Sequence, residues 1–169
     1  MSAQKAATIS KCGQYRYTLE RATKHGTAGC ATLAWIMLNP STADEMQDDP
    51  TIRKVIGFTE RSGFGKALVV NLFAYRATSP KIVRGLERRR VDGGCPEGPG
   101  NLDAIRSLRD RNVSTIVCAW GSFPWAARQV ARVRPHLYGL EYVCLGMGAS
   151  GPRHPLYVRY DQRFVPFVF

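Results

Sequence analysis

An apolar run over residues 30–38 stops abruptly at Asn39 and Pro40, and this boundary constrains the fold more than any other feature of the sequence. The run consists almost entirely of Ala, Leu, Trp, Ile and Met, which is typical of a strand covered by helices on both faces. Because proline has no N–H to donate to a sheet ladder, we expect the strand to end there. Ligands of open parallel sheets bind beyond the carboxyl ends of the strands, so the polar segment that follows lies at a candidate site.

This polar segment, residues 39–51, is rich in hydroxyl, carboxamide and carboxylate side chains, and its first members are Asn39, Ser41, Thr42 and Asp44. A plain strand-to-helix turn capped by Ser41 is an equally simple interpretation, because Ser and Asp are common helix caps. The segment alone leaves both interpretations open.

Further apolar segments predict an alternation of strands and helices. Strands are predicted over residues 15–21, 67–72, 114–119 and 140–145, and helices over residues 50–62, 102–111 and 124–133. Asp49 and Asn101 are the predicted caps of the first two helices. The alternation implies a parallel sheet with right-handed crossovers and helices on both sides. We expect the first strand to pair antiparallel with the run at 30–38, and the apolar residues 163–169 to form an edge strand.

One domain is sufficient for the 169 residues, with residues 1–13 expected as a flexible N-terminal tail and residues 81–100 as a basic loop. The loop contains four arginines but no convincing helical period. A solvated surface is the ordinary interpretation of such a loop, whereas its length within a compact domain favours a binding element.

Charge and composition narrow the classes of partner. Lys and Arg total 24 against 13 Asp and Glu, a formal charge of +11, which favours nucleic acid or a nucleotide. The longest apolar runs are far shorter than the ~20 residues of a membrane-spanning helix, so no membrane contact is expected. The 5 cysteines include no CxxC pair, and three of them lie inside apolar, strand-like runs, so buried, reduced thiols are a simpler interpretation than metal ligands. The first residues lack a secretory signal, and we expect a cytoplasmic protein.

Polar side chains converge on the carboxyl edge of the predicted sheet. Asn71 is the sharpest clue, because a carboxamide in an apolar strand must find partners or destabilise the fold. A turn whose backbone supplies those partners is the alternative. Asn71 and Asn39 together offer donors and acceptors suited to the hydrogen-bonding edge of a nucleobase. His154, in a glycine-rich loop, is suited to stabilise negative charge on a leaving group, or is an ordinary surface histidine.

Aromatic residues near the same edge are candidates for stacking on a base, although core packing is the ordinary role of such residues. They are Phe73, Tyr75, Trp120, Phe123 and Trp125. The sequence has no P-loop, no dinucleotide-binding glycine motif, no HExxH zinc motif and no serine-hydrolase elbow. These absences remove the usual support for kinase, oxidoreductase, zinc-protease and serine-hydrolase functions.

From about residue 15 onward the chain resembles a family of bacterial and phage proteins of unknown function that carries MLNPSTAD, DDPT, VNLFAYRAT, AWG and RHPLY. The order and placement of these motifs also resemble the uracil-DNA glycosylase superfamily. That resemblance implies a three-layer α/β/α fold with a central, mostly parallel four-stranded sheet, to which the N-terminal antiparallel strand is added.

In that superfamily the residue similar to Asn39 positions the attacking water, the one similar to Asn71 reads the extruded base, and the one similar to His154 supports the departing base. The late strand ending of the superfamily is similar to Trp120 and the glycine after it. Ser41 stands where the superfamily has a glycine, which implies a pocket shaped for a different or modified base. Leu156 stands where the last motif has a serine.

The sequence therefore predicts a hydrolase of the DNA glycosylase type that releases an unusual or modified base from DNA. The predicted catalytic residues are Asn39, Asp44 and His154. The predicted base-binding residues are Asn71, Phe73, Tyr75 and Trp120. The predicted nucleic-acid contacts are Ser41, Arg76, Arg88, Arg89, Arg153 and Tyr157. The expected protein is a monomer that needs no metal and no cofactor.

Two alternatives use the same fold differently. One is a non-catalytic nucleic-acid-binding module that recognises a modified base or a strand end. The other is an enzyme that acts on free nucleosides or nucleotides, against which a steep salt dependence of DNA binding would speak.

Overall fold

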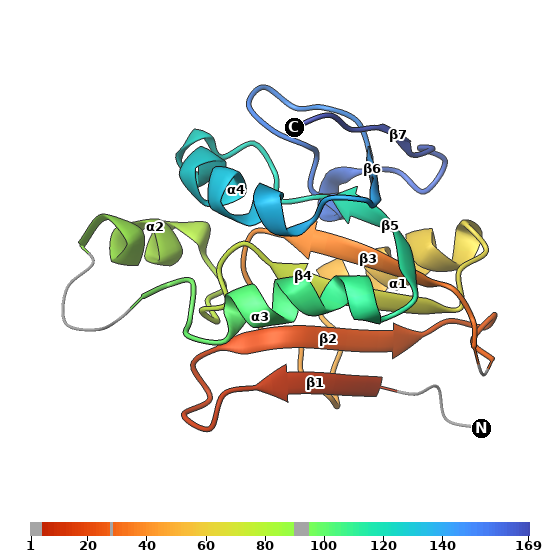
Figure 1. Ribbon diagram of the computed structural model, residues 1–169, viewed down its shortest axis with the longest axis horizontal. Coiled ribbons are helices and arrows are strands. Elements are labelled where there is room, and N and C mark those ends of the chain that lie inside the picture. The colour runs from red at the N-terminus through yellow and green to blue at the C-terminus, as the bar shows by residue number, and fades with distance from the viewer. Residues whose placement is uncertain (1–4, 28, 90–94) are drawn as a thin grey trace.

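The computed structural model describes residues 5–27, 29–89 and 95–169, and the seven strands within them form a single mixed sheet (Figure 1). The order across the sheet is β1-β2-β4-β3-β5-β6-β7. The strands are β1 (Lys5–Ile9), β2 (Arg16–Ala22), β3 (Thr32–Met37), β4 (Lys66–Asn71), β5 (Val113–Cys118), β6 (Glu141–Cys144) and β7 (Val165–Pro166). The four central strands, β4, β3, β5 and β6, are parallel, and the outer pairings are antiparallel.

The α-helices of the described residues are α1 (Pro50–Arg61), α2 (Pro80–Arg89), α3 (Asn101–Arg106) and α4 (Ala127–Val133). Short 3₁₀ helices cover Ser107–Asp110, Pro124–Ala126, Arg134–His136 and Pro155–Tyr157. The fold is therefore a mixed α/β fold. In the part of the chain described here, none of the helices has the length and apolar character that crossing a membrane requires.

Strand β3 explains why helices cover both faces of the sheet. All six of its residues are buried, and the side chains of the five that follow Thr32 alternate between two clusters of apolar residues. Trp35 packs in the cluster that contains Phe58 of α1. Ile36 packs in the cluster that contains Ile105 of α3 and Val133 of α4. An uninterrupted apolar run is thus required on both faces, as the sequence predicts for residues 30–38.

Helix α1 begins where the sequence predicts it. The Asp49 carboxylate accepts a hydrogen bond from the N–H of Ile52 at 2.8 Å, and Pro50 occupies the first turn, where its missing N–H costs nothing. The cap fixes the direction in which the segment after β3 enters the helix. It also places Asp49 itself at the edge of the sheet where β3 ends.

The predicted cap of the next helix has a different role. Asn101 is the first residue of α3, and its Nδ2 donates to the carbonyls of Asn71 and Leu72 at 2.9 and 3.1 Å. Gln129 of α4 also donates to the Leu72 carbonyl, at 2.8 Å. Two buried carboxamides from the helices therefore hold the carbonyls of the last residue of β4 and of the residue after it, while the Leu72 N–H donates to the Met37 carbonyl at 2.8 Å.

The antiparallel part of the sheet differs from the sequence-based expectation. Residues 5–9 were expected to lie in a flexible tail, but they form β1 along β2, while residues 1–4 lie outside the described residues. Strand β2 pairs with β4 rather than with β3. The sheet has seven strands in the described chain, whereas the sequence predicts four parallel strands, one N-terminal antiparallel strand and one edge strand near the C-terminus. The predicted edge strand near the C-terminus is confirmed as β7, which pairs with β6.

The basic loop expected over residues 81–100 is partly a helix. Helix α2 covers its first half because Pro80 starts the helix and Val83 and Leu86, three residues apart, form its apolar side. Val83 is fully buried in the core. The many arginines concealed this short apolar repeat in the sequence. Residues 90–94 lie outside the described residues, and residues 95–100 form a turn.

Candidate functional site

A cavity of about 710 Å³ lies where β3, β4 and β5 end, at the carboxyl edge of the parallel strands. Ligand sites of open parallel sheets lie at this edge, and ligand cavities measure about 300–1,000 Å³. Its lining comes from five parts of the chain, which are Arg16 and parts of residues 37–51, 71–80, 121–123 and 153–158.

Asn71, the last residue of β4, contributes a buried carboxamide to this cavity. Its side chain is 1% exposed, and among the described residues neither Oδ1 nor Nδ2 has a hydrogen-bond partner. Leaving a buried polar group unpartnered costs about 1–3 kcal/mol, and most such groups in folded proteins are paired. The interpretation of Asn71 as a turn residue with backbone partners is therefore wrong, and water or a ligand in the cavity can supply the missing partners.

Asn39 follows β3 directly and lines the cavity beside Asn71 in the sheet, where β3 and β4 are neighbours. Its Nδ2 donates to the carbonyls of Pro40 and Ala77, at 3.0 and 2.8 Å. The bond to Ala77 ties the segment after β3 to the segment after β4. Because both donors of the amide are used in this way, Oδ1 is the polar atom of Asn39 that is left to accept from a water or a ligand.

His154 lines the cavity from the loop after β6. Burial lowers its pKa to about 4, and the nearby charge of Asp49 opposes this shift only in part. The ring is therefore neutral at pH 7. Its Nδ1 accepts a hydrogen bond from the N–H of Leu156 at 3.3 Å, so the proton of the neutral ring is on Nε2. The side chain can donate one hydrogen bond into the cavity without carrying a charge.

Arg16, the first residue of β2, also lines the cavity and is not among the site residues predicted from the sequence. Its side chain is 2% exposed, Nη1 donates to the Ala43 carbonyl at 2.6 Å, and Nε has no partner among the described residues. Burial is the main reason that the pKa of Arg16 falls to about 10, so the guanidinium remains protonated at pH 7. The alternating segment YRYTLER gave no sign that this arginine is buried, because arginine on a strand usually faces solvent.

Asp49 also lines the cavity, although the sequence predicts it only as a helix cap. One carboxylate oxygen accepts from Ile52, and the residue lines the cavity near His154. The capping signal was correct. The Asp49 carboxylate also lies at the cavity wall, because α1 begins at the edge of the sheet. No separate pattern in the sequence indicates this position.

The sequence matches the family described as "Protein of unknown function (DUF1643)" over residues 16–156. The chain belongs to this family. The DUF1643 match begins at Arg16 and ends at Leu156, so it includes all of the cavity lining except Tyr157 and Val158. A search of curated proteins and a search of solved structures each found no match. The family description names no activity, so arguments about function must come from the cavity.

Within the DUF1643 span the cavity brings together some of the predicted site residues and not others. The predicted residues that line it are Asn39, Ser41, Asn71, His154 and Arg153, and Tyr157 joins them just beyond the span. The predicted residues that do not line it are Asp44, Phe73, Tyr75, Arg76, Arg88 and Trp120. The side chain of Arg89, at the end of α2, lies outside the described residues.

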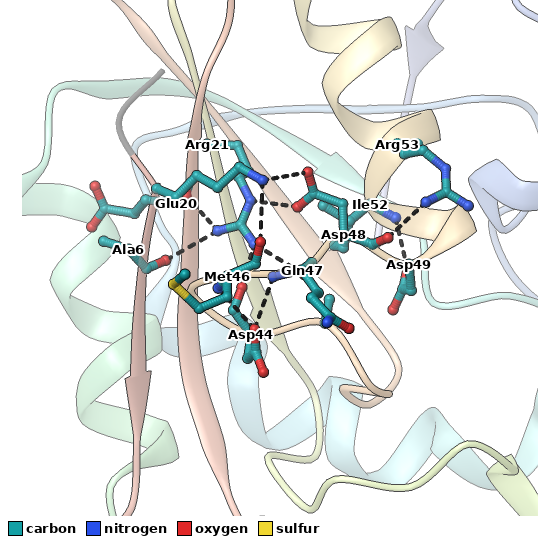
Figure 2. Close-up of polar contacts among 12 residues, drawn as sticks. Ala6, Glu20, Arg21, Asp44, Met46, Gln47, Asp48, Asp49, Ile52 and Arg53 are labelled. Carbon is teal, nitrogen blue, oxygen red and sulfur yellow. Dashed lines mark hydrogen bonds and ion pairs between the residues drawn. The ribbon is translucent and has the colours of Figure 1, made fainter. Parts of the chain in front are cut away.

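Asp44 serves the loop that contains it. Its Oδ1 accepts from the N–H groups of Gln47 and Met46, and these backbone hydrogen bonds lower the pKa of the carboxyl. Figure 2 shows that the same loop is held by Arg21, whose Nη2 donates to the Asp44 carbonyl and whose Nε donates to Asp48. A carboxylate committed to its own turn is poorly placed as a general base, and Asp49 is the carboxylate that reaches the cavity.

Most of the predicted stacking aromatics pack elsewhere. Phe73 is buried against Trp125 at a centroid distance of 5.5 Å, and Trp120 packs against the two phenylalanines that follow β7. Tyr75 meets Tyr15 edge to face. Among the predicted stacking residues, Phe123 lines the cavity, where its ring is half-buried.

Gly121 permits this position of Phe123. Its φ of +86° is a left-handed conformation that side chains disfavour, and a Cβ at this position would lie 3.0 Å from the Phe123 ring. The turn after β5 therefore depends on a glycine, and it brings the ring to the cavity.

The predicted arginines differ in their position relative to the cavity. Arg153 is exposed and lines the cavity, with its Nε donating to the Met147 carbonyl at 3.3 Å. Arg76 borders an adjacent recess and donates to the Gly13 carbonyl at 3.2 Å. Arg88 is exposed on α2. Arg153 is thus the predicted cationic contact that the cavity includes.

Proposed function

We propose that the cavity binds a nucleobase and that the protein hydrolyses the N-glycosidic bond of an unusual or modified base in DNA. The observation that carries this proposal is Asn71, which lines the cavity with both polar atoms unpartnered. A carboxamide presents an acceptor and a donor side by side, and this pattern fits the hydrogen-bonding edge of a base. The half-buried ring of Phe123 supplies a face on which a base can stack.

The chemistry assigns one task to each of three further residues. Asn39 Oδ1 orients a water molecule whose oxygen bonds to the anomeric carbon as the bond from that carbon to the base breaks. The electrons of the broken bond leave with the base, and the neutral His154 donates from Nε2 to the negative charge that develops there. Asp49 takes up the proton that the water loses.

The resemblance to the uracil-DNA glycosylase superfamily supports this proposal at Asn39, Asn71 and His154, because all three line the same cavity. Helices on both faces of a parallel four-stranded centre agree with the three-layer arrangement that the resemblance implies. The general base and the stacking ring depart from the sequence-based assignment, since Asp49 and Phe123 replace Asp44 and Phe73.

Features at the edge of the cavity favour DNA as the source of the base. The formal charge of +11 attracts a phosphate backbone, and the exposed Arg153 lies where such a backbone would pass. Tyr157 is 84% exposed although it belongs to the lining. An exposed aromatic ring beside the pocket is suited to fill the gap in a duplex from which a base has been extruded.

The test is release of free base. The protein is incubated with DNA that carries uracil, mismatched thymine or bulky phage-type modified bases, and free base is measured by mass spectrometry. We expect release from at least one substrate. Asn39→Ala should abolish the release and leave DNA binding largely intact. Gln47→Ala removes an exposed carboxamide that does not line the cavity, and it should release base at the wild-type rate.

The other outcomes distinguish the alternatives. Base release that survives both Asn39→Ala and Asn71→Leu would contradict the proposed site. Absence of release from every substrate, together with tight and salt-sensitive DNA binding, would indicate a non-catalytic binding module. Turnover of free nucleosides with little salt dependence would indicate an enzyme of nucleoside metabolism.

A further inference from the structure

We propose that Arg16 forms an anion-binding subsite in the cavity, so that the ligand is a phosphate-bearing nucleotide unit rather than a bare base. The base half of this ligand rests on the function proposed above. The anion half rests on the contacts of Arg16 alone.

A comparison of two buried arginines of β2 isolates what is unusual about Arg16. Arg16 and Arg21 are each 2% exposed. Arg21 uses one edge of its guanidinium, formed by Nε and Nη2, to donate to Asp48 Oδ1 and to the Asp44 carbonyl (Figure 2). In Arg16 only Nη1 donates, to the Ala43 carbonyl, and the Nε–Nη2 edge has no acceptor among the described residues.

The unpartnered edge of Arg16 has the geometry of an oxyanion receptor. Nε and Nη2 of a guanidinium donate two parallel hydrogen bonds, which match two oxygens of a phosphate or carboxylate. The residue lines the cavity that also contains the Asn71 carboxamide. A nucleotide joins a base to a phosphate through its sugar. A single nucleotide unit can therefore supply both a base edge for Asn71 and an anion for Arg16.

The charge of Arg16 supports the same inference. Arg16 forms no ion pair with the described residues, and a buried charge without a partner is costly. Asp49 is close enough to affect the Arg16 charge, but its Oδ1 caps α1. A bound anion would supply the counter-charge that the protein itself does not place in contact.

Calorimetric titration of the folded protein tests the subsite. The probes are the deoxynucleoside 5′-monophosphates of adenine, cytosine, guanine, thymine and uracil, the matching nucleosides, inorganic phosphate and short single-stranded oligonucleotides. We expect at least one phosphate-bearing probe to bind about 10-fold or more tightly than its nucleoside, as charge-assisted hydrogen bonds allow. Arg16→Gln should bring that ratio close to one, because the phosphate-bearing probe loses its additional affinity.

Arg128→Gln is the matched control. Arg128 is exposed on α4 and does not line the cavity, so this variant loses the same charge without touching the subsite. It should keep the wild-type ratio. Because Arg16 also anchors Ala43, circular dichroism must show that Arg16→Gln is folded. Arg16→Lys keeps the charge but loses the two-pronged edge, so it should lower the ratio as well. If neither variant folds, the ratio of nucleotide to nucleoside affinity in the wild-type protein tests the anion subsite.

The outcomes separate this inference from the proposed function. Equal wild-type affinity for nucleosides and nucleotides would overturn the anion subsite, even where Asn71→Leu abolishes nucleoside binding and the base site stands. Arg16-dependent binding of inorganic phosphate, without any binding of nucleosides, would support the subsite and contradict the proposed function. Tighter binding of oligonucleotides than of monophosphates would assign the phosphate to a DNA strand, and the reverse order to a free nucleotide.

Discussion

Arg21 donates from Nε to Asp48 Oδ1 at 2.6 Å, and this ion pair holds the segment between β3 and α1 against strand β2 (Figure 2). Neither residue lines the cavity, but the next residue, Asp49, does. The Arg21 side chain is 2% exposed, so its charge depends on these protein partners rather than on water. The pair therefore positions one wall of the cavity from outside the site.

Asp48→Ala should destabilise the protein by about 2–3 kcal/mol, because it leaves a buried guanidinium with backbone carbonyls as its only acceptors. Asp103→Ala is the control, since its ion pair with Arg106 is exposed on both sides and should contribute less than about 1 kcal/mol. Urea unfolding at pH 7 measures both. Equal losses in the two variants would contradict the clamp that Arg21 and Asp48 are inferred to form.

The ion pair between Arg21 and Asp48 should also contribute to the loss of stability at low pH. Burial alone would raise the pKa of Asp48, but hydrogen bonds from Arg21 and Lys5 hold that pKa below its ordinary value. The stability it contributes is therefore present above the unfolded-state pKa of about 4 and is lost as the pH falls through the lower folded value. In Asp48→Ala the free energy of unfolding should consequently fall less steeply below pH 4 than in the wild type.

Asn71→Leu should stabilise the empty protein while abolishing base binding. The substitution removes an unpartnered buried carboxamide at similar volume, so the free energy of unfolding should rise by about 1 kcal/mol or more. Asn101→Leu should have the opposite effect, because the Asn71 and Leu72 carbonyls lose donors at 2.9 and 3.1 Å. Thermal unfolding and base titration of the two variants provide the measurement. A destabilised Asn71→Leu would show that the carboxamide has partners in the free protein.

His154 should titrate near pH 4, which NMR of the ring protons measures directly. An unfolded histidine has a pKa of about 6.5, so between these values the unfolded chain binds more protons and stability falls as the pH falls. The slope from this residue is at most about 1.4 kcal/mol per pH unit. His154→Gln should lose this dependence, and His25→Gln, outside the cavity, should keep it. A His154 that titrates near pH 6.5 would show that the ring is solvated.

The cysteines should react in a fixed order with a chromogenic disulfide reagent. Cys12 is exposed, and a hydrogen bond with the Ser10 hydroxyl is the main cause of its lowered pKa, so it should react first. Cys95 is also exposed, so the interpretation of the cysteines as buried is wrong for Cys12 and Cys95. Partial burial of the Cys95 thiol and its hydrogen bond with the Glu97 carboxylate raise the pKa of Cys95, which should slow its reaction. Cys118 is buried with a raised pKa and should react only on unfolding. Cys12→Ser should remove the fastest phase.

The sequence predicted the centre of this fold well and its edges poorly. The run at 30–38 is apolar on both faces, and Asp49 with Pro50 forms a local helix start, so both can be recognised without knowledge of distant contacts. Strand β1 and helix α2 have short, partly exposed apolar patterns. Their structure depends on β2 and on the core around Val83, which no local pattern reveals.

The sequence predicted those site residues whose position is set by the end of a strand. Asn39 and Asn71 follow from the ends of two neighbouring parallel strands, and topology alone places them together. Phe73 and Phe123 show the limit, because each lies a few residues beyond a strand, where the turn decides whether a ring enters the core or the cavity. Arg16 was missed because burial of an arginine is a property of the whole packing and not of its own strand.

The cavity walls come from both ends of the chain, with Arg16 on one side and the loop that contains His154 on the other. A polypeptide still attached to the ribosome exposes Arg16, Asn39 and Asn71 long before residue 154 has been made. Until β6 and the loop after it join the sheet, the polar groups of the site face an open edge instead of a pocket. We therefore expect a ligand to engage the complete set of cavity residues only after the loop that contains His154 is in place.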